Sequence, residues 1–134
     1  ETDFDQALEI PNHMKGHPIW KKAIKELENI RSRITPQEKL DCVVKCLMII
    51  SRAFHLLVSN FGDEVTADDI LQYTCYILLK SNLTNLYSYI NYINTFHYFA
   101  SQERQGMESF CFQNIQIACE YIKLVWCPRY LCLL

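Results

Sequence analysis

Residues 66–96 read TADDILQYTCYILLKSNLTNLYSYINYINTF, and they decide the fold because two helix patterns follow each other here. Thr66 is a typical helix cap, and the largely apolar pattern after it continues to about Lys80. A helix that is apolar on most sides must be buried by its neighbours. A tyrosine-rich helix pattern restarts near Thr84 and reaches Phe96. The stretch therefore predicts two packed helices inside an all-α domain.

The clearest helix start in the chain is the sequence Thr35-Pro36-Gln37-Glu38. Thr35 can cap a helix, proline suits the first helical turn, and Glu38 lies three residues after the cap, as in a capping box. The apolar stripe that follows is wide and ends near Gly62, which is a plausible helix terminator. These signals predict one long helix in the centre of a bundle.

Two more helix patterns complete the domain, one from Ile19 to about Ile30 and one from about Phe112 to Trp126. The polar residues 97–109, which include a glycine, predict a loop before the last helix. The fold class is therefore all-α, a single layered helical bundle of about five or six helices. We divide the chain into three parts: a polar N-terminal strap (1–18), the helical domain (19–126) and an apolar C-terminal tail (127–134).

The composition argues against several classes of function. With 134 residues, half of them hydrophobic, the chain can form one domain with a real core. A net charge of −2, with the 13 Lys and Arg scattered, argues against nucleic-acid binding. No apolar run approaches the ~18 residues that a transmembrane segment needs. A single globular domain remains.

The cysteines and histidines do not form a recognisable metal or disulfide pattern. The seven cysteines are odd in number, have no CxxC pair and mostly lie in apolar helix patterns, where cysteine acts as a small hydrophobe. Cys42 and Cys46 are four residues apart, and so are His13 and His17, but neither pair has further ligands nearby. We therefore expect no metal site, no disulfide and a reduced, cytoplasmic location.

Asp68 and Asp69 are polar residues at the head of an otherwise apolar helix. Acids in a first turn interact favourably with the positive end of the helix, by roughly 0.3–1 kcal/mol each. By this argument alone both acids have a structural role. A functional role for either one needs a further signal.

Such a signal comes from three stretches in order. Residues 35–43, TPQEKLDCV, are similar to the motif T/S-P-x-x-K-L-x-C-I, and residues 67–71, ADDIL, to A-D-D-x-L-P. Residues 80–96 are similar to K-x-N-P-P-x-L-x-S-x-I-x-Y-I-x-x-F, and the last helix fits the motif T-N/S-L-x-x-A-x-x-F-I less closely. In this order the chain resembles the VPS-nine (vacuolar protein sorting nine) domain, the guanine nucleotide exchange factor domain for endosomal Rab-five-type GTPases.

The resemblance implies a role for Asp68 that its position in the helix does not. In the family the equivalent carboxylate reaches into the nucleotide site of the GTPase, disfavours magnesium and pairs with the phosphate-loop lysine. The resemblance thus implies exchange without covalent catalysis or a cofactor, a nucleotide-free or GDP-bound Rab-five-type partner, and a cytoplasmic protein peripheral to early endosomes. Asp69 would remain a capping acid. The residues expected to bind the partner are Asp68, Gln72, Asn82, Phe110 and Gln113.

This chain departs from the family pattern at three of those positions. Gln72 replaces a proline, Phe110 replaces a tyrosine and Gln113 replaces a threonine. Loss of one hydrogen bond to a charged partner costs roughly 1.5–3 kcal/mol, or roughly ten- to hundredfold in rate if the bond forms in the transition state. Within the family two functions therefore stay open: an exchange factor in endocytosis and vesicle trafficking, and an exchange-inactive module that binds a Rab or another partner as a scaffold. Outside the family, the alternative is an unrelated helical interaction domain.

Overall fold

The computed structural model describes residues 16–57, 66–81, 83, 85–97 and 102–126, and this part of the chain is helical and without strands. The all-α prediction is confirmed. The predicted strap up to residue 15, the residues around Gly62 and the apolar tail lie outside the described residues. The elements are α2 (Pro18–Glu28), the 3-10 turn η1 (Asn29–Ser32), α3 (Pro36–Leu57), α4 (Ala67–Lys80), α5 (Leu86–Phe96) and α6 (Gln102–Trp126).

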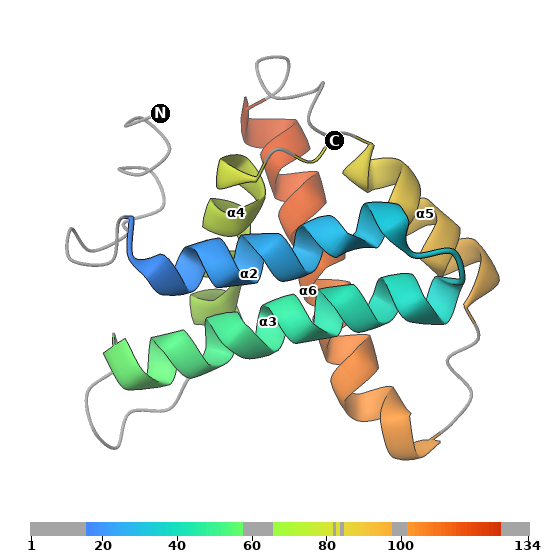
Figure 1. Ribbon diagram of the computed structural model, residues 1–134, viewed down its shortest axis with the longest axis horizontal. Helices are drawn as coiled ribbons and strands as arrows, with labels where there is room; N and C mark the ends of the chain where they lie inside the picture. The colour runs from blue at the N-terminus through green and yellow to red at the C-terminus, as the bar shows by residue number, and fades with distance from the viewer. Residues whose placement is uncertain (1–15, 58–65, 82, 84, 98–101, 127–134) are drawn as a thin grey trace.

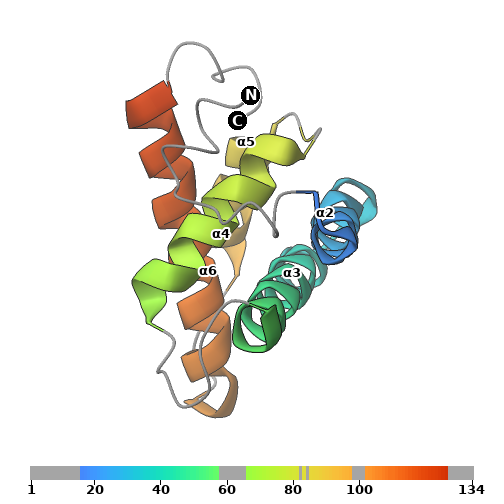
Figure 2. The same ribbon diagram turned by 90° about the vertical axis from the view of Figure 1, so that its left-hand side faces the viewer.

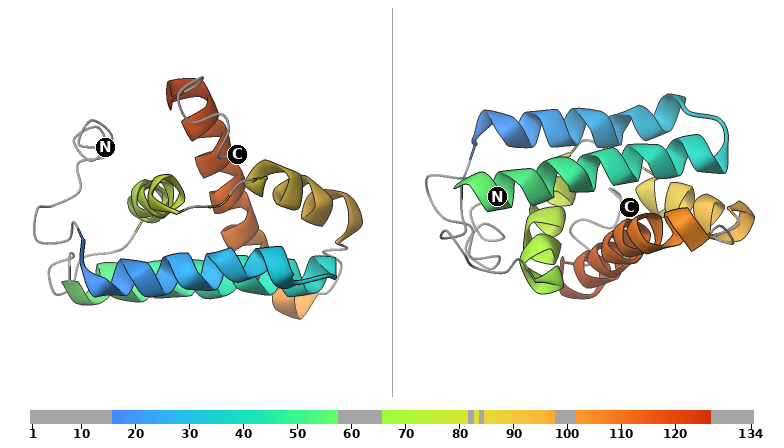
Figure 3. Two further views of the ribbon diagram at one scale, coloured as in Figure 1. Left: turned by 45° about the horizontal axis from the view of Figure 1, so that its top comes forward. Right: turned by 90° about the horizontal axis from the view of Figure 1, so that it is seen from below.

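The helices form two layers. Helices α2 and α3 lie side by side and antiparallel, as a hairpin joined by η1 (Figure 1 and Figure 3). The second layer holds α4, α5 and α6, and α3 contacts all three of them. Seen along the hairpin, the two layers separate clearly (Figure 2). The predicted layered bundle, with α3 as its central helix, is the architecture that forms.

Local sequence signals fix where the helices begin. At the start of α3, the Glu38 amide donates to Thr35 Oγ1 (3.1 Å) and the Thr35 amide donates to Glu38 Oε1 (3.0 Å), which is the predicted capping box. These hydrogen bonds lower the pKa of Glu38. At the start of α2, His17 Nδ1 accepts from the Ile19 amide (3.2 Å) and Pro18 occupies the first helical position. Pro18 therefore opens the helix and does not belong to the strap.

The predicted loop before the last helix is wrong for residues 102–109, because α6 already begins at Gln102. Gln, Glu, Arg and Met in this segment are good helix formers, and one exposed Gly106 costs only about 1 kcal/mol. The restart predicted near Thr84 also differs. Helix α5 begins at Leu86, after Asn85 in the left-handed region (φ 65°).

A buried lysine joins the two layers. Lys39 on α3 is 7% exposed, and its ammonium donates to the Ile30 carbonyl (2.8 Å) and lies 4.4 Å from the centre of the Tyr89 ring on α5. Burial lowers the pKa of Lys39. Tyr92 on α5 adds a second tie, because its hydroxyl donates to the Ile34 carbonyl (3.1 Å). These contacts hold α5 against the hairpin.

The core lies between the two layers, and α4 is buried most deeply, as its apolar pattern predicts. Tyr73 on α4 stacks on Trp20 of α2 (5.3 Å between ring centres) and meets Phe54 of α3 edge-on (5.4 Å). Eight residues of α4 are buried: Ile70, Tyr73, Thr74, Cys75, Tyr76, Ile77, Leu78 and Leu79. This packing holds α4 rigidly, directly after the turn that carries Asp68.

Candidate functional site

The first turn of α4 is fixed by a reciprocal cap. The Asp69 amide donates to Thr66 Oγ1 (3.2 Å), and the Thr66 amide and hydroxyl donate to Asp69 Oδ2 (3.0 and 2.9 Å). Both oxygen acceptors are therefore used to satisfy amides that the helix itself leaves without partners. The capping role expected of Asp69 is confirmed.

Asp68 lies beside this cap but takes no part in it. Its side chain is exposed, and among the described residues it has no hydrogen-bond or salt-bridge partner. The capped turn and the buried body of α4 hold its backbone, so the carboxylate stands on a rigid support at the positive end of a helix. Such a group is available to a cation that approaches from outside.

Gln72 lies one helical turn after Asp68 and is also exposed, so the two side chains share one face of α4. Further along this face, Cys75 is buried near Cys119 of α6. The face that carries Asp68 and Gln72 thus begins in solvent and ends in the contact with α6. The exposed residues of α4 lie in its first two turns, and residues 73–79 are buried.

Phe110 and Gln113 lie three residues apart on α6, and both are exposed; Phe110 is 44% exposed, whereas its neighbour Phe112 is 3% exposed. Helices α4 and α6 pack together and run in the same direction, upward in Figure 2. Among the described residues, no hydrogen bond joins Asp68 or Gln72 to this pair. A docking surface that spans both helices therefore stays a prediction. Asn82 lies outside the described residues, between the buried Ser81 and Leu83.

Sequence reasoning missed an exposed apolar face on α6. Ile117, Tyr121 and Leu124 are 54%, 40% and 81% exposed, and they follow Phe110 at helical spacing on the side opposite the core residues. Apolar side chains that gather on one exposed face indicate an interaction surface. The spacing was visible in the sequence, but only the position of the core tells which apolar face of α6 stays in solvent.

The thiols of the described residues are poor nucleophiles. Burial raises the pKa of Cys75 and of Cys119 to about 12 and the pKa of Cys111 to about 11. The five cysteines that the structure describes are free and buried, including Cys42 and Cys46, which pack in the core as predicted. Within the same residues, His, Cys, Asp and Glu do not come together in a group that could hold a metal ion.

In the described part of the chain, no helix combines the length and the apolar character that crossing a bilayer requires.

Comparison with known proteins identifies the family to which this chain belongs. Residues 20–125 match the Vacuolar sorting protein 9 (VPS9) domain. Receptor-mediated endocytosis protein 6 of Caenorhabditis briggsae is 32% identical over 92% of this chain, which corresponds to 11% of that protein. The human GTPase-activating protein and VPS9 domain-containing protein 1 is 28% identical over 92% of this chain and 8% of its own length.

A further relative, the human Rab5 GDP/GTP exchange factor, is 32% identical over 76% of this chain and 20% of its own length. The chain thus spans a small part, 8% to 20%, of the length of these relatives. No solved structure gives a significant match. The family match covers most of the chain and includes the capped first turn of α4 and the exposed residues of α6, so this chain belongs to the VPS9 domain family.

Proposed function

We propose that this domain is a guanine nucleotide exchange factor for a Rab5-type small GTPase, with Asp68 as the residue that promotes GDP release. The observation that carries the proposal is the Asp68 carboxylate, exposed and without a partner among the described residues, on a capped turn of a VPS9 domain. The names of the relatives, which refer to endocytosis and to Rab5 exchange, support the choice of GTPase. We place the activity in the cytoplasm, at the surface of early endosomes.

The proposed chemistry is competition for cations. A small GTPase holds its nucleotide through magnesium and a lysine of the phosphate loop. Picomolar binding corresponds to about −16 kcal/mol, so GDP leaves slowly on its own. A carboxylate competes with phosphate for the same lysine and disfavours the bound magnesium. By binding the nucleotide-free form better than the loaded form, the domain shifts the population toward GDP release.

The rest of the proposed contact surface determines how fast exchange proceeds. Gln72 and the exposed pair Phe110 and Gln113 would contact the GTPase beside Asp68. Phe110 keeps an aromatic ring but has no hydroxyl, so one hydrogen bond to the partner is absent. A hydrogen bond to a charged group contributes roughly 1.5–3 kcal/mol. Its absence lowers the exchange rate by roughly ten- to hundredfold relative to a domain with tyrosine at this position.

The same departures from the family pattern leave a second function, binding of the GTPase without exchange. With Gln72 and Phe110 in place of proline and tyrosine, the domain could bind the GTPase through its exposed surface without accelerating GDP release. It would then act as a scaffold that recruits the GTPase. Binding and exchange must therefore be measured separately.

The test is release of a fluorescent GDP analogue from purified Rab5-type GTPases, with binding to the nucleotide-free GTPase measured in parallel. Asp68→Asn and Asp69→Asn form a matched pair, because each removes one carboxylate from the same turn, and the amide oxygen of the second variant can still accept from the Thr66 amide. We expect acceleration by the unaltered domain and by Asp69→Asn, and none by Asp68→Asn. Binding without acceleration would favour the scaffold, and absence of binding would exclude both functions.

A further inference from the structure

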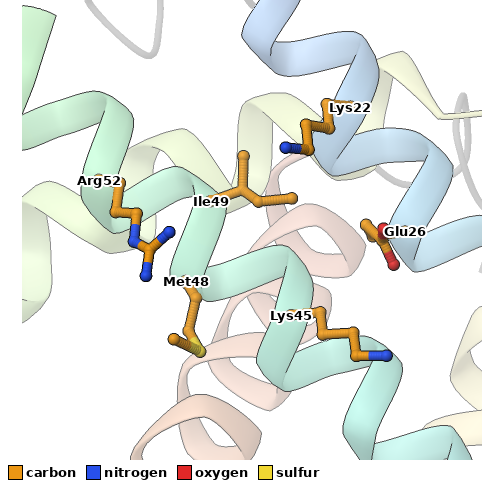
Figure 4. Close-up of a pocket in the computed structure, with 6 residues that line it drawn as sticks. All are labelled: Lys22, Glu26, Lys45, Met48, Ile49 and Arg52. Carbon is orange, nitrogen blue, oxygen red and sulfur yellow. The ribbon is translucent and has the colours of Figure 1, made fainter.

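A groove runs between α2 and α3 on the side of the hairpin that is turned away from α4 and α6. The α3 residues that face it, Lys45, Met48 and Arg52, are exposed, whereas the residues of α3 that face the second layer are buried. The groove is open to solvent and has a volume of about 210 Å³. Ile49 lies between the two helices, facing Lys22 and Glu26 of α2, and Met48 lies on α3 between Arg52 and Lys45 and points away from α2 (Figure 4). Its lining is Lys22, Glu26, Lys45, Met48, Ile49 and Arg52.

The charged groups of this groove form no salt bridge within the described residues. Lys22, Lys45 and Arg52 form neither a hydrogen bond nor a salt bridge there, and the same holds for Glu26. The groove therefore carries three cations and one anion, all available to a ligand.

The basic residues of the whole chain are also concentrated in the α2–α3 hairpin. Residues 16–57, which form the hairpin, contain eight of the 13 Lys and Arg and only four of the 15 Asp and Glu. The rest of the chain contains five basic and eleven acidic residues. A net charge of −2 thus hides a basic hairpin and an acidic remainder, and the basic hairpin attracts acidic partners.

We propose that this groove binds an acidic amphipathic helix of a partner protein. Lys45 and Arg52 are seven residues apart on α3, which is about 10.5 Å along a helix. Two acids seven residues apart on a helix that lies along α3 would reach both cations. The apolar side chains between those acids would then contact Met48 and Ile49, in the manner of a helix bound in a groove.

The shape and charge of the groove favour a helix over an anionic membrane. Ile49 is half-buried between the two helices, where a side chain inserted from a helix reaches it more readily than a flat surface does (Figure 4). Glu26 would repel a uniformly anionic surface, whereas a helix can place a basic or amide side chain opposite it. The groove is lined by α2 and α3, whereas Asp68 lies on α4, in the other of the two layers that Figure 2 separates, so an occupant of the groove leaves Asp68 accessible.

The test uses fluorescence anisotropy with a labelled, alanine-based helical peptide of about 18 residues, long enough to be helical in water. The peptide carries two glutamates seven residues apart with leucines between them, and a control peptide has glutamines in their place. The protein variants are Lys45→Glu and Arg52→Glu, each compared with Lys25→Glu, which makes the same charge change at an exposed position of α2 outside the groove. Circular dichroism and the unfolding midpoint show that each variant is folded.

We expect the acidic peptide to bind the unaltered domain. Each groove variant should lower the affinity for this peptide by about tenfold or more, whereas the affinity of Lys25→Glu should stay within about threefold of that of the unaltered domain. The glutamine peptide should bind far more weakly than the acidic peptide, and added salt should weaken the binding of the acidic peptide. The proposal is overturned if neither peptide binds, or if Lys25→Glu weakens binding as much as Arg52→Glu. It is also overturned if phosphatidylserine vesicles bind the domain while the acidic peptide does not.

Discussion

Lys39→Met should destabilise the domain more than the change of any exposed lysine. Methionine keeps most of the apolar stem in its place, so the packing volume changes little. The variant loses the hydrogen bond from the ammonium to the Ile30 carbonyl (2.8 Å) and the contact with the Tyr89 ring (4.4 Å). A hydrogen bond from a charged donor contributes about 1.5–3 kcal/mol, and a cation–π contact about 0.5–1 kcal/mol or more.

Two effects make the loss of stability in Lys39→Met smaller than the sum of these contributions. The Ile30 carbonyl keeps a longer hydrogen bond from the Arg33 amide (3.4 Å), and methionine removes a charge whose burial already lowers the pKa of Lys39. We therefore expect the free energy of unfolding to fall by about 2 kcal/mol. Urea unfolding followed by circular dichroism measures it, with Lys45→Met on the exposed face of the same helix as control, expected within about 0.5 kcal/mol of the unaltered domain. Equal stability of Lys39→Met and Lys45→Met would show that Lys39 does not join the layers.

Three further predictions concern other residues. Thr66→Ala should lower the free energy of unfolding by about 1 kcal/mol in urea titrations, because it breaks the cap with Asp69; an unchanged midpoint would contradict the cap. If the domain is an exchange factor, Phe110→Tyr should raise the GDP release rate by roughly ten- to hundredfold in the fluorescent-GDP assay, and a rate that does not rise would contradict the proposed contact. Stability should fall as the pH rises from 9 toward 12, because Cys75 and Cys119 ionise near 9.0 when unfolded but only near about 12 when buried. The slope of unfolding free energy against pH should be shallower in Cys75→Ala by about 1.4 kcal/mol per pH unit, and an identical slope would contradict burial of that thiol.

The sequence predicts the elements whose signals are local. The capping box at Thr35 and the helix cap at Thr66 both form as predicted, because a cap needs only residues within one helical turn. The burial of α4 also follows from its own composition. The start of α6 at Gln102 is different, since a polar segment with one glycine is compatible with a loop and with an exposed helix, and the local pattern does not decide between them.

Long-range features are the part that sequence patterns could not supply. No local pattern marks Lys39 as buried, because its burial depends on Ile30 and Tyr89, which come from two other elements. The groove between α2 and α3 likewise needs both helices to be in place before Lys22 and Arg52 line the same hollow. For Asp68, helix position alone suggested a structural acid; the family resemblance separated it from Asp69, and the hydrogen bonds of the structure show that Asp69 forms the cap.

The most direct measurement is the rate of GDP release from a Rab5-type GTPase in the presence of Asp68→Asn and of Asp69→Asn, at equal concentrations of folded domain. If the exposed carboxylate of Asp68 drives exchange, release falls to the spontaneous rate with Asp68→Asn and stays close to that of the unaltered domain with Asp69→Asn. Acceleration that survives in Asp68→Asn would contradict the role proposed for this residue.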